Sequence, residues 1–513
     1  MRITKIALTL ILVIGASALQ AQVYSYNEFA KTFSTLNTAG TARFQALGGS
    51  HTALGADITS AASNPAGLGF YTKSEFVAGL GITALSTNTN YFTTNTSDNK
   101  SIVNVPSFGL VLANDFHRGD NWKGAFSISY SRQVNLHSNI AFQGVNTKSS
   151  LLDNVVESAN GRNLDKEYND NAHQPTSFES LFYNAYLVDP IKGKTNQYTN
   201  VLQDNTVANQ TGTVTSVGSI SQWNLGYGAG YQDKVYFGMS VGLSNLRYDT
   251  KMNFSERYTN SKYVNGIAYD ENRLLTGSGL NVSGGVIFRP TPALRLGVSV
   301  TSPTWYSAIQ ESTDATLKTD VVPNAIVDGT TGKTIAKVDP ITLYPRDFEF
   351  QLTTPLKASA GMAYFFSKSG FLSVDAEYVG YGGMNLGANA LTASDNAAFK
   401  TTYNGRIKTA YQDVINLKTG AEFRTGIMSF RGGVGYFADP YRSNTTGTLN
   451  RGNLQFSGGI GIKTEGFYVD LAVVNTNYDS AYTPYTLKNT ADYASAKITN
   501  SMTNVRVSVG FYL

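Results

Sequence analysis

Apolar and polar residues alternate most clearly at the end of the chain. Between Asn504 and Leu513 every second position is apolar: Val505, Val507, Val509, Phe511 and Leu513. Successive side chains of a strand point to opposite faces, so this period of two predicts a β-strand with one apolar face that runs to the last residue. Such a strand suits either the closing strand of a β-barrel or the edge strand of a secreted β-sandwich.

Similar alternating segments recur along the chain. Residues 222–231 and 235–243 alternate in the same way and are joined by only three residues, 232–234, which predicts a β-hairpin. Fourteen strands are expected, at 74–87, 104–113, 122–136, 217–231, 235–249, 276–289, 293–305, 352–366, 371–384, 411–424, 427–438, 453–463, 467–477 and 500–513. The many repeats, and their even number, favour a membrane barrel over a sandwich.

The connections between these strands alternate between short and long. The short ones lie at 114–121, 232–234, 290–292, 367–370, 425–426 and 464–466, and most of the others are longer. Outer-membrane barrels have short periplasmic turns and long outer loops, so the C-terminus is expected on the periplasmic side. The predicted fold class is all-β, a 14-stranded antiparallel transmembrane β-barrel over 73–513, with 137–216 as a long extracellular loop.

Charged residues of the expected strands share the phase of the polar positions. They are Arg295, Lys357, Asp375, Glu377, Lys418, Glu422, Arg424, Arg431 and Asp470. A Lys or Arg on a lipid-facing position near the bilayer midplane costs about 2 to 4 kcal/mol, whereas a lumen tolerates charge. The apolar set is therefore expected to face lipid.

The first residues predict export. Met1–Lys5 is basic, Ile6–Ile14 is mostly apolar, and small residues follow, so 1–21 is expected to be a signal peptide. The chain has no cysteine, which argues against disulfides and thiolate metal sites. Without Arg2 and Lys5, 38 basic and 36 acidic residues remain, so a nucleic-acid partner is not expected. The 31 Tyr and 27 Phe suit aromatic girdles at the membrane interfaces.

Residues 22–72 precede the first expected strand and contain many small side chains. A fourteen-stranded barrel has room for such a segment in its lumen, so we expect an N-terminal plug. The motif Asn64-Pro65-Ala66 predicts a turn, because proline fixes its own backbone angle and Asn64 can hydrogen-bond to its own backbone. A periplasmic tail is the alternative for this segment.

Several short motifs, in order, resemble a known family. They are Asn27-Glu28-Phe29, Gly55-Ala56-Asp57, Asn64-Pro65-Ala66-Gly67-Leu68, Arg289-Pro290-Thr291-Pro292 and Arg431-Gly432-Gly433-Val434-Gly435-Tyr436. With them the chain resembles the FadL/TodX-type outer-membrane transporters of hydrophobic compounds. The resemblance implies passive uptake of long-chain fatty acids or aromatic hydrocarbons by a plugged, monomeric barrel, with capture in an outer groove and lateral exit. It also implies a gating role for Asn64, Pro65 and Ala66, with a merely structural turn as the alternative.

The segment 137–216 is the expected capture surface for a hydrophobic small-molecule ligand. A short helix is predicted after Ser177 and before Pro190, with Phe178, Leu181, Phe182 and Ala185 on one face and Tyr186 nearby. We expect Phe178, Leu181, Phe182 and Tyr186 to contact ligand. The alternative is that these side chains pack on each other and cap the barrel.

Inward-facing cations are the second set of binding candidates. Arg295 and Arg431 are expected to face the lumen, where a carboxylate ligand needs a cation. The alternative is that they pair with Asp375, Glu377, Glu422 or Asp470.

No enzyme motif or cofactor site is expected. The histidines His51, His117, His137 and His173 lie in no nucleophile or metal motif. The glycine-rich run 226–230 has the phase of a strand and no helix after it, which argues against a nucleotide loop. The predicted function is uptake of hydrophobic compounds across the bacterial outer membrane, whose lipids are expected to surround the barrel. A structural or partner-binding barrel and a general porin are the alternatives.

Overall fold

The computed structural model describes residues 26–35, 39–114, 121–203, 206–328, 332–388, 391–442, 449 and 451–513. The predicted signal peptide 1–21 and the first residues of the predicted plug, 22–25, lie outside this range.

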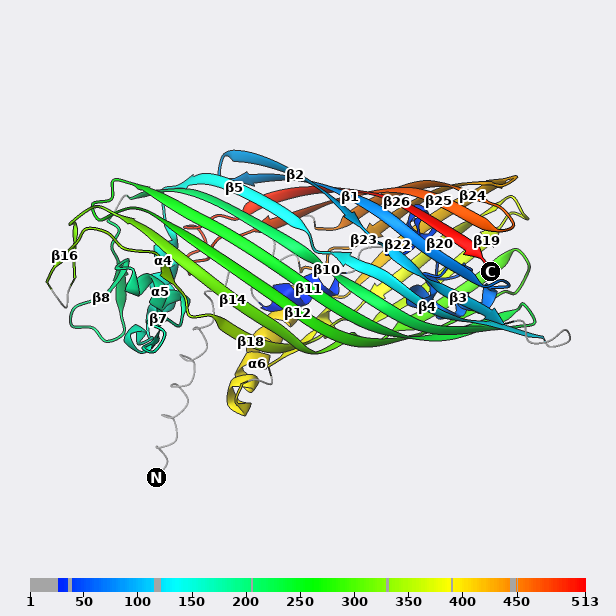
Figure 1. The fold of residues 1–513 in the computed structure, drawn as a ribbon, viewed down its shortest axis with the longest axis horizontal. Coiled ribbons are helices and arrows are strands. Elements are labelled where there is room, and N and C mark those ends of the chain that lie inside the picture. The colour runs from blue at the N-terminus through cyan, green and yellow to red at the C-terminus, as the bar shows by residue number, and fades with distance from the viewer. Residues whose placement is uncertain are drawn as a thin grey trace, which may run out of the picture.

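The chain forms a closed, 14-stranded antiparallel β-barrel, as predicted (Figure 1). Its wall consists of β1 (Glu75–Tyr91), β2 (Thr94–Asn104), β3 (Ser107–Asn114), β4 (Trp122–Asn135), β5 (Ser138–Asn146), β10 (Val207–Tyr231), β11 (Val235–Thr259), β12 (Val264–Phe288), β13 (Leu294–Thr301), β14 (Trp305–Val321), β18 (Arg346–Thr353), β19 (Lys357–Phe365), β20 (Gly370–Val379), β22 (Val414–Thr425), β23 (Met428–Phe437), β24 (Asn453–Lys463), β25 (Phe467–Tyr482) and β26 (Ala496–Tyr512).

Short breaks divide four of the wall strands into two pieces each: β2 and β3, β4 and β5, β13 and β14, and β18 and β19. Pro106, Pro303 and Pro355 lie at three of these breaks. Proline has no N–H to donate to a strand ladder, which explains why the pairing stops there. At the fourth break the register between β4 and β10 shifts between Ile220 and Ser221.

The last strand closes the barrel. β26 pairs with β1 from Glu75 opposite Tyr512 to Asn90 opposite Lys497, and with β25 on its other side. The alternation at the C-terminus therefore marks the closing strand of a barrel.

An apolar belt surrounds the half of the barrel that carries the short turns. On β11 the outward side chains Val235, Phe237, Met239, Val241 and Leu243 are between 37% and 66% exposed. These are the positions that a transmembrane barrel presents to lipid.

The strands β10, β11 and β12 have 25 residues each and continue beyond this belt (Figure 1). On the extended part of β10 the exposed positions are the polar residues Asn209, Thr211 and Thr213. We call this extension, together with residues 147–203, the crown. It contains the helices α4 (Leu151–Ala159) and α5 (Phe178–Asn184).

Several expected loops contain wall strands; the gap 88–103, for example, is almost entirely β1 and β2. Of the predicted loop 137–216, residues 138–146 and 207–216 belong to the wall strands β5 and β10. The predicted loop 306–351 contains most of β14 and part of β18, and 250–275 is mostly strand. Outside the membrane the outward side chains are polar, so these strands lack the apolar alternation used to recognise them.

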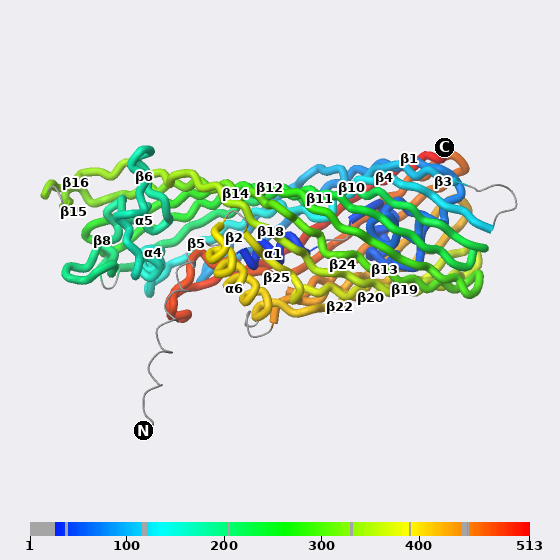
Figure 2. The backbone as a smooth tube through the Cα atoms, turned by 90° about the horizontal axis from the view of Figure 1, so that it is seen from below, coloured from blue at the N-terminus to red at the C-terminus, as the bar shows by residue number. Residues whose placement is uncertain are grey.

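The N-terminal segment lies in the lumen (Figure 2). We call residues 39–71 the plug; it contains α2 (Ala42–Ala46), α3 (Ser60–Ser63) and the 3-10 helix η1 (Pro65–Phe70). The helix α2 contacts β23 to β26, whereas η1 contacts β4, β10, β11 and β12. The plug therefore bridges opposite parts of the wall.

Two further helices lie at the level of the crown boundary. α1 (Tyr26–Ser34) precedes the plug and packs in the lumen against α6 (Ala393–Ala410), which follows the short strand β21 (Asn385–Gly387). Tyr26 contacts the rings of Phe399 and Tyr403 on α6. Among the described residues, no helix is both long and apolar enough to cross a membrane.

The lipid-facing belt can be tested by placing a charge on one strand at two depths. Met239→Arg, at the centre of the belt, is expected to lower the free energy of unfolding by about 2 to 4 kcal/mol. Asn253→Arg, exposed on the crown part of the same strand, is the matched control and should change it by less than about 1 kcal/mol. Urea titration of the barrel in lipid vesicles measures both, and equal losses would contradict the position of the belt.

Candidate ligand cavity in the barrel lumen

Glycines of three neighbouring strands form a cradle for the motif Asn64-Pro65-Ala66. A Cβ added to Gly238 on β11 would lie 2.4 Å from the carbonyl carbon of Pro65. A Cβ on Gly228 of β10 would lie 2.5 Å from the Pro65 oxygen, and one on Gly285 of β12 would lie 2.1 Å from Asn64 Oδ1. The glycine-rich run 226–230 therefore lets the plug approach the wall backbone closely.

Asn64 fixes the start of η1. Its Oδ1 accepts the N–H of Ala66 at 3.1 Å, and its Nδ2 donates to the backbone oxygens of Thr52 at 2.7 Å and Val298 at 3.3 Å. The side chain thus caps its own turn and joins it to a second plug loop and to the wall.

Two carboxylates hold the opposite side of the plug. Asp375 on β20 accepts the backbone N–H groups of His51 and Thr52 at 2.7 and 2.8 Å. Glu422 on β22 lies 3.5 Å from the guanidinium of Arg43. These buried acids point inward, as the alternation predicts, and their partners belong to the plug.

Arg431 belongs to the same charge cluster. It lies 2.6 Å from Glu422 and 2.5 Å from Asp470, and its side chain is 6% exposed. The structure therefore pairs Arg431 with wall carboxylates, the alternative that the sequence left open, and the residue does not line the large cavity described below.

Arg295 also contacts the plug. Its guanidinium lies between the rings of Phe70 and Phe365, 4.2 and 4.3 Å from their centroids, and Nη1 donates to the backbone oxygen of Leu54 at 2.6 Å. The Arg295 guanidinium therefore helps to dock the plug against the wall, through its contacts with Phe70 and Leu54.

The candidate capture residues lie together in the crown, away from the large cavity. Leu181 and Phe182 are fully buried in an apolar cluster with α4 and the wall. Phe178 is partly exposed and packs on Phe182 and Tyr269, and Tyr186 donates its hydroxyl to Asp328 at 2.9 Å. The packing of Leu181 and Phe182 matches the capping alternative.

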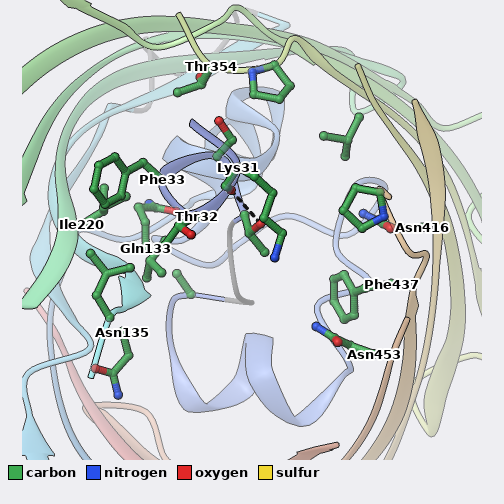
Figure 3. Close-up of a pocket in the computed structure, with 18 of the residues that line it drawn as sticks. Lys31, Thr32, Phe33, Gln133, Asn135, Ile220, Thr354, Asn416, Phe437 and Asn453 are labelled. Atoms are coloured by element: carbon green, nitrogen blue, oxygen red, sulfur yellow. Dashed lines mark hydrogen bonds between the residues drawn. The ribbon is translucent and has the colours of Figure 1, made fainter. Parts of the chain in front are cut away.

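A cavity of about 1020 Å³ lies in the lumen between the plug, α1 and the wall (Figure 3). Ligand sites for drug-sized molecules usually have about 300 to 1,000 Å³. Its lining combines aromatic rings with amides and hydroxyls, among them Phe33, Gln133, Asn135, Gln222, Tyr248, Asn281, Thr304, Tyr403, Asn416, Phe437, Asn453 and Asn504. Such a mixture can hold both the apolar and the polar part of one molecule.

None of the nine residues proposed from the sequence as gating or binding residues lines this cavity. Alternation placed side chains inward correctly, but it carried no information on which inward side chains the plug covers. The helix α1 contributes Lys31 and Phe33 to the lining. Its signals in the sequence are an amphipathic pattern and the motif Asn27-Glu28-Phe29, and neither indicates a place beside the cavity.

His51 is a buried plug residue with an unusual environment. It is 1% exposed, and neither ring nitrogen has a hydrogen-bond partner among the residues that the structure describes. Burial lowers its pKa to about 4, against an opposing effect of Asp57. No group of three or more His, Asp or Glu side chains suited to a metal ion occurs in the described part of the chain.

The glycine cradle predicts a sharp difference between two neighbouring glycines. Gly238→Ala is expected to displace Pro65 and raise the ion conductance of single channels, because the new methyl group has no room. Gly284→Ala is the control, since a Cβ there would meet nothing closer than 3.9 Å. Equal conductance of the two variants in planar bilayers would show that the motif does not dock in this cradle.

The docked plug should weaken in acid. A released His51 takes up a proton below its ordinary pKa of about 6.5, whereas the docked one does so only near pH 4. Docking stability is therefore full above pH 6.5 and falls as the pH is lowered toward 4. Limited proteolysis of residues 39–71 should accelerate over this interval, and His51→Phe should remove most of the change. A rate independent of pH in the unaltered chain would be inconsistent with a buried neutral His51.

A scan against protein-family models and a search of curated proteins found no match for this sequence. Among solved structures, the fold is similar to that of a FadL homologue from Pseudomonas aeruginosa, with 11% sequence identity, coverage of 93% of this chain and 99% of that chain, and a TM-score of 0.53. It is also similar to the toluene transporter TodX from P. putida, with 13% identity, 93% and 99% coverage and a TM-score of 0.51. The predicted resemblance to FadL/TodX-type transporters is therefore confirmed at the level of the fold.

Proposed function

We propose that the chain is an outer-membrane channel for the passive uptake of hydrophobic small molecules, such as long-chain fatty acids or aromatic hydrocarbons. The observation that carries the proposal is an internal cavity above a docked plug, inside a barrel whose fold resembles those of a FadL homologue and a toluene transporter. A general porin fits less well, because the plug occupies the lumen on the side of the short turns.

In the proposed route a ligand enters through the crown, occupies the cavity and leaves when the plug moves. Phe178, the first residue of α5, and Tyr186, just after its end, are partly exposed and are proposed as first contacts. The buried Leu181 and Phe182 would become accessible when the crown opens. Asn64, Pro65 and Ala66 are proposed as the gate, because their displacement from the glycine cradle would free the lumen.

The apolar belt supports a location in the outer membrane, with the crown outside the cell and lipid as the surrounding partner. We propose that the barrel acts as a monomer and catalyses no reaction. The proposed substrates are small molecules, with no role for nucleic acid.

The crown gives a specific reason to keep one alternative, a barrel that binds a partner at the cell surface. Strands β10 to β12 extend well beyond the belt and present polar side chains on the outside. A surface of this kind is available to another macromolecule whether or not the lumen transports ligand.

Uptake into lipid vesicles distinguishes these functions. Vesicles that contain the mature barrel are expected to accumulate radiolabelled oleate or toluene faster than protein-free vesicles, while ion conductance stays low. Deletion of residues 26–71 should raise the conductance, because it removes α1 and the plug. High conductance of the intact barrel would favour a porin. Uptake of both compounds at the protein-free rate would rule out the proposed transport and favour the partner-binding barrel.

A further inference from the structure

Six short turns, the entry to β1 and the end of β26 form a ring at one end of the barrel (Figure 1). Backbone hydrogen bonds join neighbouring turns around this ring, for example from the N–H of Arg289 to the oxygen of Lys234. The ring is therefore one continuous surface around the barrel, and we call it the rim. Its described residues are 72–74, 121–123, 232–234, 289–293, 366–369, 424–427, 463–466 and 513.

Positive charge prevails on the rim. Among the described residues, each of the six turns and the entry to β1 carries one basic side chain. These side chains are Lys73, Lys123, Lys234, Arg289, Lys368, Arg424 and Lys463. In the described part of the rim they are opposed only by the acidic side chains of Asp233 and Glu465 and by the C-terminal carboxylate. The cations are thus spread around the whole circumference and are not gathered on one side.

Most of the rim cations have no carboxylate partner. Lys123 and Arg424 form ion pairs, whereas the other five form none with any carboxylate of the described residues. Lys73 and Lys463 instead lie over the same ring, that of Tyr512, with their ammonium groups 5.7 and 5.2 Å from its centroid. Two like charges that share a ring repel each other, so an anion beside them is favourable.

The outward charges of the long strands show a different pattern. Arg257 on β11 lies 3.0 Å from Asp320 on β14, and Lys318 on β14 lies 2.9 Å from Asp270 on β12. Positive and negative side chains compensate each other there. The excess of positive charge is therefore a property of the rim and not of the exposed surface in general.

An exposed aromatic residue accompanies every rim cation. Trp122, Phe288 and Phe423 each immediately precede one and are 43%, 46% and 58% exposed. The aromatic residues within four positions of the other cations are Phe76, Tyr231, Phe366 and Phe467, which are also exposed. Aromatic rings of membrane proteins lie at the boundary between hydrocarbon and headgroups, and long basic side chains extend from there into the polar layer. The rim cations are therefore expected at the level of the lipid headgroups.

We propose that the rim binds the phosphodiester headgroups of anionic phospholipids in the leaflet that it reaches. Basic side chains beside a membrane surface attract anionic lipids. Cations on every turn, next to the apolar belt, fit lipids that surround the barrel, whereas an acidic protein would meet only one side of the ring. The inference goes beyond the proposed transport and rests only on the proposed location in the outer membrane.

The experiment uses electron paramagnetic resonance of spin-labelled lipids on the mature barrel in phosphatidylcholine vesicles. It compares the association of phosphatidylglycerol, which is anionic, with that of phosphatidylcholine, which has no net charge. We expect a preference for phosphatidylglycerol of at least about threefold. Raising the salt concentration from about 0.1 M to about 1 M should remove most of this preference, because the Debye length falls from about 10 Å to about 3 Å.

Two matched triple variants locate the lipid site. Lys73→Gln, Lys234→Gln and Lys368→Gln together remove three exposed rim cations, and we expect the preference to fall to less than about half. The same three positions changed to arginine should retain it. The variants leave out the β3–β4 turn, because its residues 115–120 lie outside the described part of the chain.

The control removes the same amount of charge from the other end of the barrel. Lys192→Gln, Lys194→Gln and Lys251→Gln together neutralise three exposed crown lysines and should leave the lipid preference unchanged. Circular dichroism and heat-modifiable gel mobility establish that each variant is folded. Equal association of the two lipids with the unaltered barrel would overturn the proposal. A preference that survives in the rim glutamine variant, or that falls as far in the crown variant, would overturn it as well.

Discussion

Every feature of this molecule depends on the closure of its β-sheet. In a bilayer the backbone N–H and C=O groups find no water, so each must be bonded within the protein. Pairing of β1 with β26 satisfies the two edges that an open sheet would expose. Closure also separates a lipid-facing set of side chains from a lumen-facing set, and only the lumen-facing set can carry charges and amides. The plug, its glycine cradle and the cavity all exist within this enclosed polar space.

The transmembrane part of the fold could be predicted from the sequence because lipid imposes a strict alternation. On β11 the apolar positions from Val235 to Leu243 are those that face outward, and the hairpin around 232–234 follows directly. Beyond the membrane this constraint ends. The outward residues Thr211 and Thr213 are polar, so the crown half of β10 has no apolar outward face by which it could be distinguished from a loop.

The candidate site was less predictable, for a related reason. Alternation indicated that Arg295 and Arg431 point inward. It could not show that Arg295 contacts the plug or that Arg431 pairs with carboxylates of the wall. Asn64 was recognisable from its local turn, whereas its contact with the glycines of three strands depends on the closed barrel. Lys31 and Arg451 are more than four hundred positions apart and meet at one aromatic ring. A local sequence pattern cannot predict a contact between residues so far apart in the chain.

The most direct test of the account is to tie the plug to the wall and measure transport. The backbone N–H of Ala42 donates to the hydroxyl of Ser508 at 2.8 Å, and the chain has no cysteine of its own, so Ala42→Cys with Ser508→Cys places one thiol pair at this contact. The account predicts that the disulfide forms in the folded barrel, that oleate uptake stops, and that a reductant restores it. Failure to cross-link would contradict a docked plug. Uptake by the cross-linked barrel that is as fast as uptake after addition of the reductant would contradict a plug that gates the lumen.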